Sequence, residues 1–237
     1  MTYDAGVFHM FIQTEFRFSG GRCEHAVSND GFTWVVLNPA ILSIPDTDED
    51  GLYDPHPAVV NGARYIVYSG MPTFSRVPQP DIYLAQSSTN TWFGPWVRVG
   101  KIMDHQDLPH HNSREHPDYE CGIEGAQLVE LPDGRVLLNA TCFLPEGERG
   151  NRQRVFFAIA DKVEGPYKTL GPVLTPGEPG ENGHSTVLID NQELMLVYQS
   201  RVRTTNHRWR FGIAKCSLGE MQEKLTRPEP IRRNKRS

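Results

Sequence analysis

Long apolar runs, paired cysteines and an excess of either charge are all missing from these 237 residues. No apolar stretch approaches the roughly 20 residues that a membrane-spanning helix needs, so we expect no membrane partner. The four cysteines are scattered without a Cys-x-x-Cys pair, which argues against a thiolate metal site or a redox motif. The formal net charge of −5 provides no positive field for nucleic acid. The one basic run, "RRNKRS" at the C-terminus, is expected to be a frayed end.

The start of the chain lacks the marks of a secretory signal peptide. "MTYDAGVFHMFIQ" has neither a basic start nor a small-residue cleavage site, so we expect a cytoplasmic protein. Apolar residues make up 38% of the chain and charged residues 22%, which is usual for a folded globular protein. Nothing in the sequence predicts the oligomeric state.

Helical periodicity is nearly absent, and short alternating apolar runs between turn residues recur in its place. Gly and Pro together make 39 of the 237 residues, which also indicates an all-β chain. One strand pattern occurs four times, in "CEHAVSNDGFTW", "DIYLAQSSTNTWFGPW", "VFFAIADKVEGPY" and "FGIAKCSLGEM". Aligning these runs places Ala26, Ala85, Ala160 and Ala214 at equivalent positions.

Each alanine strand follows an inner strand, and three of the four units begin with a further strand that carries a polar residue. We call this first strand the anchor strand; it occurs in "YDPHPAVVNG", "IEGAQLVELPDG" and "GHSTVLIDNQ". Four strands per unit, repeated, are typical of a β-propeller; a sandwich or barrel with similar strands is the alternative. We predict one propeller domain with units over 1–45, 46–104, 118–175 and 180–220, and a basic tail over 221–237.

The polar residues of the anchor strands are the candidate functional residues. The first strand of a propeller blade lines the central axis, so Asp54, Glu124 and His184 would converge there from three different units. Cleavage of a glycosidic bond needs such convergence, because one carboxylic acid protonates the leaving oxygen while a second carboxylate activates water or attacks the sugar.

The anchor motifs resemble those of the five-bladed β-propeller glycoside hydrolases, most closely family 43, with relatives in families 32 and 68. "YDPHPAVV" matches the Asp-Pro motif of that group, "IEGAQLVEL" its Glu-Gly motif and "NGHSTVLID" its Gly-His motif. The resemblance implies a propeller of the five-bladed type, with Glu124 as general acid and Asp54 as the carboxylate that tunes this acid. It also implies that His184 lies on the axis, with Arg201 close by as a substrate-binding residue.

The catalytic base that this group carries in its first blade has no match here. "VFHMFIQ" occupies the corresponding strand, and Asp4 before it is expected in the turn. Either the chain is a piece of a longer product, or it is a degenerate propeller that binds sugar without cleaving it. No cofactor and no metal ligand are predicted for the reaction, although the resemblance admits a structural calcium ion near His184.

Two polar segments and one histidine each have both an ordinary structural interpretation and a functional one. "DTDEDGLYD" begins like a calcium loop but lacks the closing Glu, so a solvated acidic loop between units is favoured. "DHQDLPHHNSREHPDYE" is either exposed or folds over the end of the central axis where the anchor residues would converge. His56 follows the Asp-Pro motif and is a candidate for binding substrate.

"SRVRTTNHRWR" is rich in arginine and would usually be a solvated hairpin. The chain as a whole, however, also resembles family 130, whose members use phosphate to cleave mannosides and need cationic side chains but no protein base. The sequence therefore predicts a hydrolase of arabinofuranoside-like or xyloside-like bonds with a carbohydrate partner. A sugar-binding propeller without turnover and a glycoside phosphorylase are the alternatives.

Overall fold

Strands make up nearly all of the computed structural model, which describes residues 1–14, 21–72, 79–108, 122–145, 151–174, 180–202 and 206–221. The described residues contain fifteen strands, one short 3-10 helix, η1 (His105–Asp107), and a helical turn at 218–221. The all-β prediction is confirmed. None of the described residues form a helix with the length and hydrophobicity needed to cross a bilayer.

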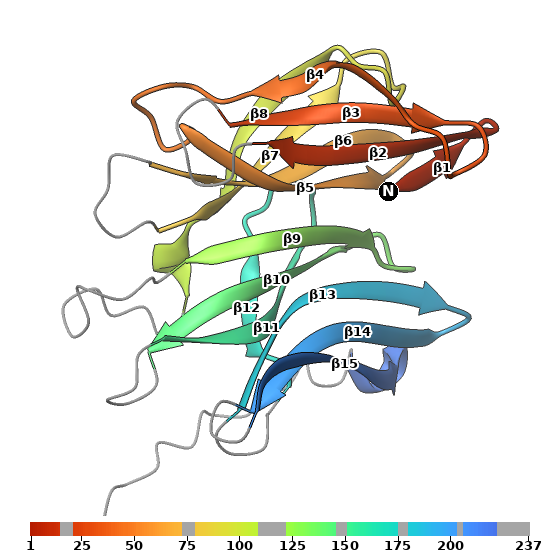
Figure 1. Cartoon of the computed structure of the whole chain (residues 1–237). Coiled ribbons are helices and arrows are strands. Elements are labelled where there is room, and N and C mark those ends of the chain that lie inside the picture. Colours follow the sequence, from red (N-terminus) through yellow and green to blue (C-terminus); the bar gives the residue numbers. More distant parts are fainter. Residues whose placement is uncertain are drawn as a thin grey trace, which may run out of the picture.

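The strands form four antiparallel sheets, which we call the first to fourth blades (Figure 1). The first blade contains β1 (Thr2–Asp4), β2 (Val7–Thr14), β3 (Arg22–Ser28) and β4 (Val35–Leu42). The second contains β5 (Gly51–Val60), β6 (Ala63–Met71), β7 (Asp81–Ser87) and β8 (Trp96–Met103). The third contains β9 (Ile123–Glu130), β10 (Val136–Pro145), β11 (Asn151–Ala160) and β12 (Lys168–Pro172). The fourth contains β13 (Gly180–Asp190), β14 (Glu193–Val202) and β15 (Asn206–Ser217).

Strands that follow one another in sequence are neighbours in every sheet, so each blade is one continuous segment of the chain and the four blades form a propeller arrangement. Tight turns join each anchor strand to its inner strand. Asn61 and Gly62 have φ angles of 50° and 72°, the left-handed pair that a two-residue hairpin turn requires. Asn191 and Gln192 form the same kind of turn in the fourth blade, with φ of 49° and 84°.

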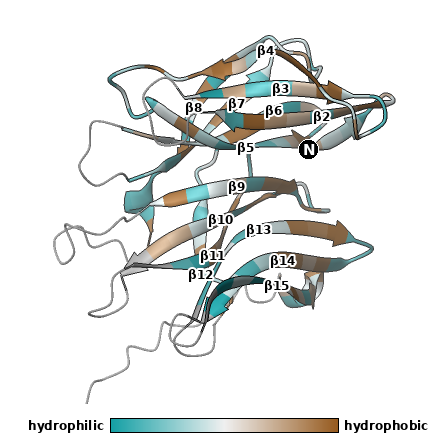
Figure 2. Cartoon of the chain, viewed as in Figure 1, coloured by the Kyte–Doolittle hydropathy of each residue, from teal (hydrophilic) through white to brown (hydrophobic). Residues whose placement is uncertain are grey.

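Each interface between adjacent blades is a hydrophobic core of its own. Phe11 and Ile41 of the first blade meet Ile66 of the second. The second and third blades share the largest cluster, and the third and fourth share another. Both faces of the two middle sheets therefore take part in apolar cores. Figure 2 shows hydrophobic segments, in brown, along strands of the sheets. This stacking of four sheets rules out the alternative of two sheets packed as a sandwich.

The alanines occupy the predicted position in the first, second and fourth blades. In the third blade the equivalent alanine lies two residues from the predicted one. Ala26, Ala85 and Ala214 pair with the fourth residue of their inner strands: Met10, Ile66 and Leu196. The residue that pairs with the equivalent Leu138 of the third blade is Ala158, not Ala160. A shift of two residues keeps the same face of a strand, so the pattern alone could not separate the two alanines.

Candidate functional site

The three long anchor strands are interrupted by a β-bulge at the same place. The pairing register shifts after Tyr53 in β5 and after Gly183 in β13, and β9 shifts where it faces Asn139 and Thr141. The bulge residues Asp54, Gly125 and His184 have φ angles of 49°, 61° and 41°, all in the left-handed region. A bulge bends the strand and redirects its side chains, so each anchor strand changes the direction of its side chains at this position.

These bulges bring the three predicted anchor residues together. Ligand atoms of Asp54, Glu124 and His184 all lie within 4.8 Å of one another, although 130 residues separate the first from the last. His184 Nε2 lies 3.6 Å from Glu124 Oε1. Asp54 and His184 occupy the bulge position itself, whereas Glu124 precedes its bulge and is the counterpart of Tyr53 and Gly183.

The Glu124 carboxyl group is buried, with only 4% of the residue exposed. The Tyr53 hydroxyl donates a hydrogen bond to Glu124 Oε2 at 3.3 Å, so the two oxygens of this carboxyl face different neighbours. Gly125 keeps the space beside it open, because a Cβ there would lie 3.6 Å from Asp54 Oδ2 and 3.8 Å from His184 Nδ1.

Burial raises the pKa of the Asp54 carboxyl group, and the nearby His184 opposes this effect. A second carboxyl group within 4.8 Å also disfavours ionisation of both at once. Asp54 is therefore suited to share or hold a proton beside Glu124, and poorly suited to serve as a permanently ionised nucleophile.

The spacing between Asp54 and Glu124 also bears on the role of Asp54. Inverting glycosidases keep their two carboxyl groups about 6.5–9.5 Å apart so that a water molecule fits between them. Asp54 and Glu124 are closer than that, since their oxygens lie within 4.8 Å. This pair therefore leaves no room for an activated water, and Asp54 does not have the position of an inverting base.

The same three side chains could hold a metal ion with two carboxylate oxygens and one imidazole nitrogen. Calcium takes six to eight oxygen ligands, which this set does not provide by itself. Calcium near His184 therefore stays a prediction.

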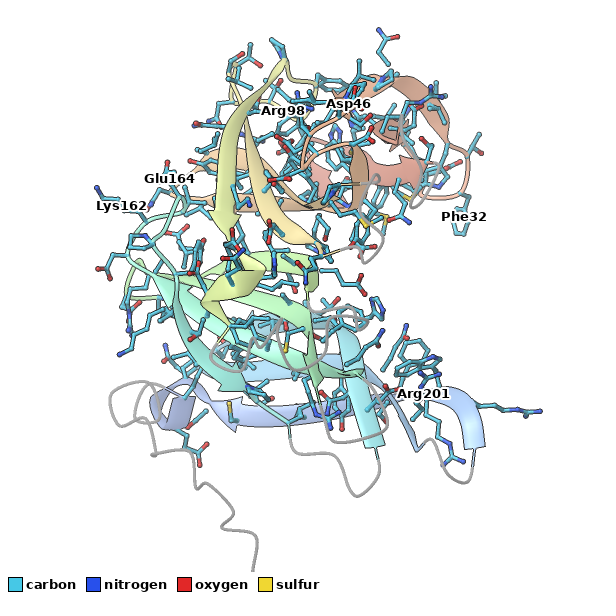
Figure 3. All side chains as sticks on the ribbon, turned by 90° about the vertical axis from the view of Figure 1, so that its left-hand side faces the viewer. Phe32, Asp46, Arg98, Lys162, Glu164 and Arg201 are labelled. Atoms are coloured by element: carbon cyan, nitrogen blue, oxygen red, sulfur yellow. The ribbon has the colours of Figure 1, made fainter. Side chains whose placement is uncertain are left out.

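His56 and Arg201 lie outside this group of three. The ring nitrogen Nδ1 of His56 lies 2.9 Å from the carbonyl oxygen of its neighbour Pro57. Burial and the terminal amino group lower the pKa of His56 to about 4, so its ring is neutral under ordinary conditions. Arg201, labelled on the fourth blade in Figure 3, pairs with Glu181 at 2.5 Å and stacks over Trp209 at 4.4 Å.

Asp4 lies beside the first hairpin turn, where it pairs with Val7. Its carboxylate accepts a hydrogen bond from Arg64 at 2.5 Å. It is therefore part of a contact between the first and second blades and does not join Asp54 and Glu124.

The acidic loop before β5 is only partly the solvated segment that we expected. Asp50 is buried, and Glu49 accepts hydrogen bonds from Tyr68 at 2.5 Å and Arg98 at 2.9 Å. In the part of the chain that the structure describes, no metal-sized cluster forms from this loop. Most of the histidine-rich segment falls in 109–121, and the basic tail in 222–237, so both lie outside the described residues.

A second cluster of possible ligands follows β8. Asp81, Asp104 and His105 come together there, but Lys101 Nζ lies 2.6 Å from Asp81 and 3.1 Å from Asp104. This ammonium group supplies the positive charge that a metal ion would bring, so the cluster is a structural ion-pair network.

Tyr53 and the side chains that contact the bulges from neighbouring blades were not predicted from the sequence. Tyr53 resembles an ordinary core aromatic, because an aromatic residue at the start of a buried strand has no distinguishing pattern. Its place one residue before the Asp-Pro motif, matching Glu124 before Gly125, was the available signal.

Comparisons with known proteins support the fold. No family model and no curated protein match the sequence. An endo-arabinase from Bacteroides thetaiotaomicron matches in structure with a TM-score of 0.62 at 15% identity, covering 91% of this chain and 72% of that one. A thermostable family-43 glycoside hydrolase matches with a TM-score of 0.65 at 16% identity, covering 89% and 68%. The GH32 β-fructofuranosidase of Bombyx mori matches at 0.63 and 13%, covering 91% and 44%.

At these identities the likeness is one of fold. The chain is therefore similar in architecture to β-propellers that occur in glycoside hydrolases, the group whose anchor motifs it resembles.

Proposed function

We propose that this chain is a glycoside hydrolase whose general acid is Glu124. The observation that carries the proposal is the convergence of Asp54, Glu124 and His184 from three blades within 4.8 Å. Nothing in the local structure requires three polar side chains from distant parts of the chain to meet at the bulges of the anchor strands. Acid catalysis, in contrast, requires the acid and its neighbouring groups to converge at one site.

In this proposal Glu124 protonates the oxygen of the leaving sugar. Asp54 lies beside it as the tuning carboxyl group: a neighbouring carboxyl disfavours loss of the proton from Glu124. His184, whose side chain is 38% exposed, would contact a sugar hydroxyl group. Arg201 and His56 are proposed as more distant substrate-binding residues.

The same proposal includes a β-propeller of the five-bladed type. β1 has three residues where β5 has ten, and the fourth blade has three strands where the second and third have four. In the described residues we identify no third carboxylate beside Asp54 and Glu124, so the base remains unassigned.

Arabinofuranoside-like or xyloside-like bonds are the proposed substrates. The anchor motifs resemble family 43, and an endo-arabinase is among the proteins of similar fold. A carbohydrate partner in the cytoplasm and a reaction without a cofactor belong to the same proposal.

Chromogenic arabinofuranosides and xylosides test the proposal directly. We expect turnover by the wild-type chain and a loss of about 10²-fold or more in kcat for Glu124→Gln, which removes the acidic proton but keeps the shape. Glu164→Gln is the matched control, because Glu164 is an exposed residue labelled at the periphery in Figure 3. Equal activity of Glu124→Gln and the control would contradict the assignment of the acid.

A sugar-binding propeller without turnover is the second candidate, favoured by the close spacing of the only two carboxyl groups found together in the described part of the site. Retained binding of arabino- or xylo-oligosaccharides with no hydrolysis would establish it. A rate that depends on added phosphate would favour a phosphorylase.

A further inference from the structure

Each of the three bulges is held by a side chain from the preceding blade. The Asp54 amide donates a hydrogen bond to Gln13 Oε1 at 2.6 Å, from the second blade to the first. The Gly125 amide donates to Ser69 Oγ at 3.1 Å, from the third blade to the second. The His184 amide donates to Thr141 Oγ1 at 2.7 Å, from the fourth blade to the third.

The three accepting side chains occupy one repeat position. On each inner strand, the accepting residue lies six positions after the first residue beyond the hairpin turn. These residues are Gln13 on β2, Ser69 on β6 and Thr141 on β10. Ser69 pairs across its sheet with Tyr53, and Thr141 pairs with Glu124. A contact that recurs at one position in three blades, between different residue types, is a feature of the architecture.

These hydrogen bonds offset two costs of the bulges. A residue other than glycine in the left-handed region carries a cost of about 1–2 kcal/mol, which applies to Asp54 and His184. A bulge also removes its N–H group from the ladder, and a buried N–H group without a partner is costly. Ser69 and Thr141 are fully buried, so the acceptors are shielded from water.

We propose that Gln13, Ser69 and Thr141 are positioning residues that set the relative placement of Asp54, Glu124 and His184. Each acts through a backbone amide of the next blade, and none needs to touch the substrate. Ser69 holds the amide next to Glu124, and Thr141 holds the amide of His184 itself. The kinetic part of this inference rests on the proposed function, whereas the backbone part does not.

The fourth blade provides a matched control. Gln199 occupies the same repeat position on β14 and pairs with Gly183 across the sheet, as Thr141 pairs with Glu124. In the described residues no anchor-strand bulge of a following blade faces Gln199. A Gln199→Leu substitution therefore changes the same strand position without touching an amide of the site.

Amide hydrogen exchange followed by NMR tests the backbone part. Thr141→Val keeps the shape but removes the acceptor, and we expect the His184 amide to exchange roughly five- to tenfold faster. Thr141→Ser restores the hydroxyl and should restore protection, and Gln199→Leu should leave this amide unchanged. If Thr141→Val does not fold, Gln13→Leu compared with Gln13→Glu tests the Asp54 amide in the same way. Unchanged exchange in Thr141→Val, or an equal increase in Gln199→Leu, would overturn the proposal.

Steady-state kinetics on the same substrates separate positioning from general destabilisation. Ser69→Ala should lower kcat about tenfold with little change in KM, because it displaces the acid. Thr141→Val should mainly raise KM, because it displaces a sugar-contacting imidazole. Similar losses in both constants for both variants would indicate a merely structural role. A wild-type chain without activity but with the expected exchange pattern would remove the proposed function and leave the positioning contacts in place.

Discussion

Asp54 combines two unfavourable properties at one residue. Its backbone is in the left-handed region with φ of 49°, and burial raises the pKa of its carboxyl group. Aspartate and asparagine accept this backbone region more readily than most residues do. A strained residue with a perturbed titration is typical of functional sites.

Asp54→Asn should stabilise the protein at neutral pH. The folded-state pKa of Asp54 is raised, so its favourable contribution is complete below the unfolded-state pKa of about 3.9 and is lost as pH rises through the folded-state value. Asparagine keeps the shape and the backbone preference without a charge. Thermal melts should show a higher Tm for the variant at about pH 7 and no gain at about pH 4.

The exposed Asp190→Asn variant is the control for this measurement, and it should show no such change with pH. A gain of equal size at both pH values would mean that the carboxyl group does not titrate as described.

Gly125→Ala should lower both stability and activity. The φ angle of 61° makes any Cβ costly, by about 1–2 kcal/mol, and the new methyl group would lie between Asp54 and His184. Gly62→Ala is the matched control, because Gly62 has φ of 72° and a Cβ added there would meet nothing within 4 Å.

Both glycine variants should lose similar stability in urea denaturation, but only Gly125→Ala should lose turnover or sugar binding. Equal effects on activity would show that the open space beside Gly125 is not used.

At the scale of the strand pair, β2 and β3 carry a buried contact between two histidines. His9 Nδ1 lies 3.0 Å from His25 Nε2, and the His25 ring stacks on Phe11 with centroids 4.7 Å apart. Burial, and to a lesser extent His9, lowers the pKa of His25 to about 4. Burial also lowers the pKa of His9, with Asp4 opposing.

This pair should make the fold sensitive to mild acid. A lowered folded-state pKa contributes stability above the unfolded-state value of about 6.5, and that stability is lost as pH falls toward about 4. The urea midpoint should therefore fall between about pH 7 and about pH 5. His25→Gln should show a smaller fall; a remainder is expected because His56 has a similarly lowered pKa. An identical fall in the variant would show that His25 does not cause the acid sensitivity.

At the scale of the whole molecule, three buried interfaces hold four blades together, and the outer face of the fourth blade is not covered by described residues. Leu84 is fully buried in the core between the second and third blades. Leu188, Phe211 and Ile213 of the fourth blade are 48%, 81% and 64% exposed. The stability of the molecule is therefore concentrated in its middle sheets.

Two leucine substitutions should measure this difference. Leu84→Ala should lower the free energy of unfolding by about 2–5 kcal/mol, because it leaves a cavity in a packed core. Leu188→Ala should cost less than about 1 kcal/mol, because half of its side chain is already in contact with water. Chemical denaturation of both variants is the measurement, and similar losses would show that the outer face of the fourth blade is covered in solution.

Much of the fold was predictable because its signals are local. Alternation of apolar residues, the Asn61-Gly62 turn and the spacing of repeated strands all depend on neighbours in the chain. The two-residue shift from Ala160 to Ala158 marks the limit of this reasoning, since both alanines lie on the same face of β11. Arg201 illustrates a second limit: its pairing with Glu181 depends on the register between β13 and β14.

The amino-acid order alone establishes the all-β repeat, its turns and the choice of Asp54, Glu124 and His184 as anchor residues. That these side chains meet is a property of the folded molecule, because a bulge in each anchor strand redirects them and contacts with the preceding blade hold the bulges. The raised pKa of Asp54 likewise comes from burial between blades. The physical reason is that the groups in contact lie far apart in the chain: the hydrogen-bond partners that hold the bulges are separated by 41 to 56 residues, beyond any local pattern.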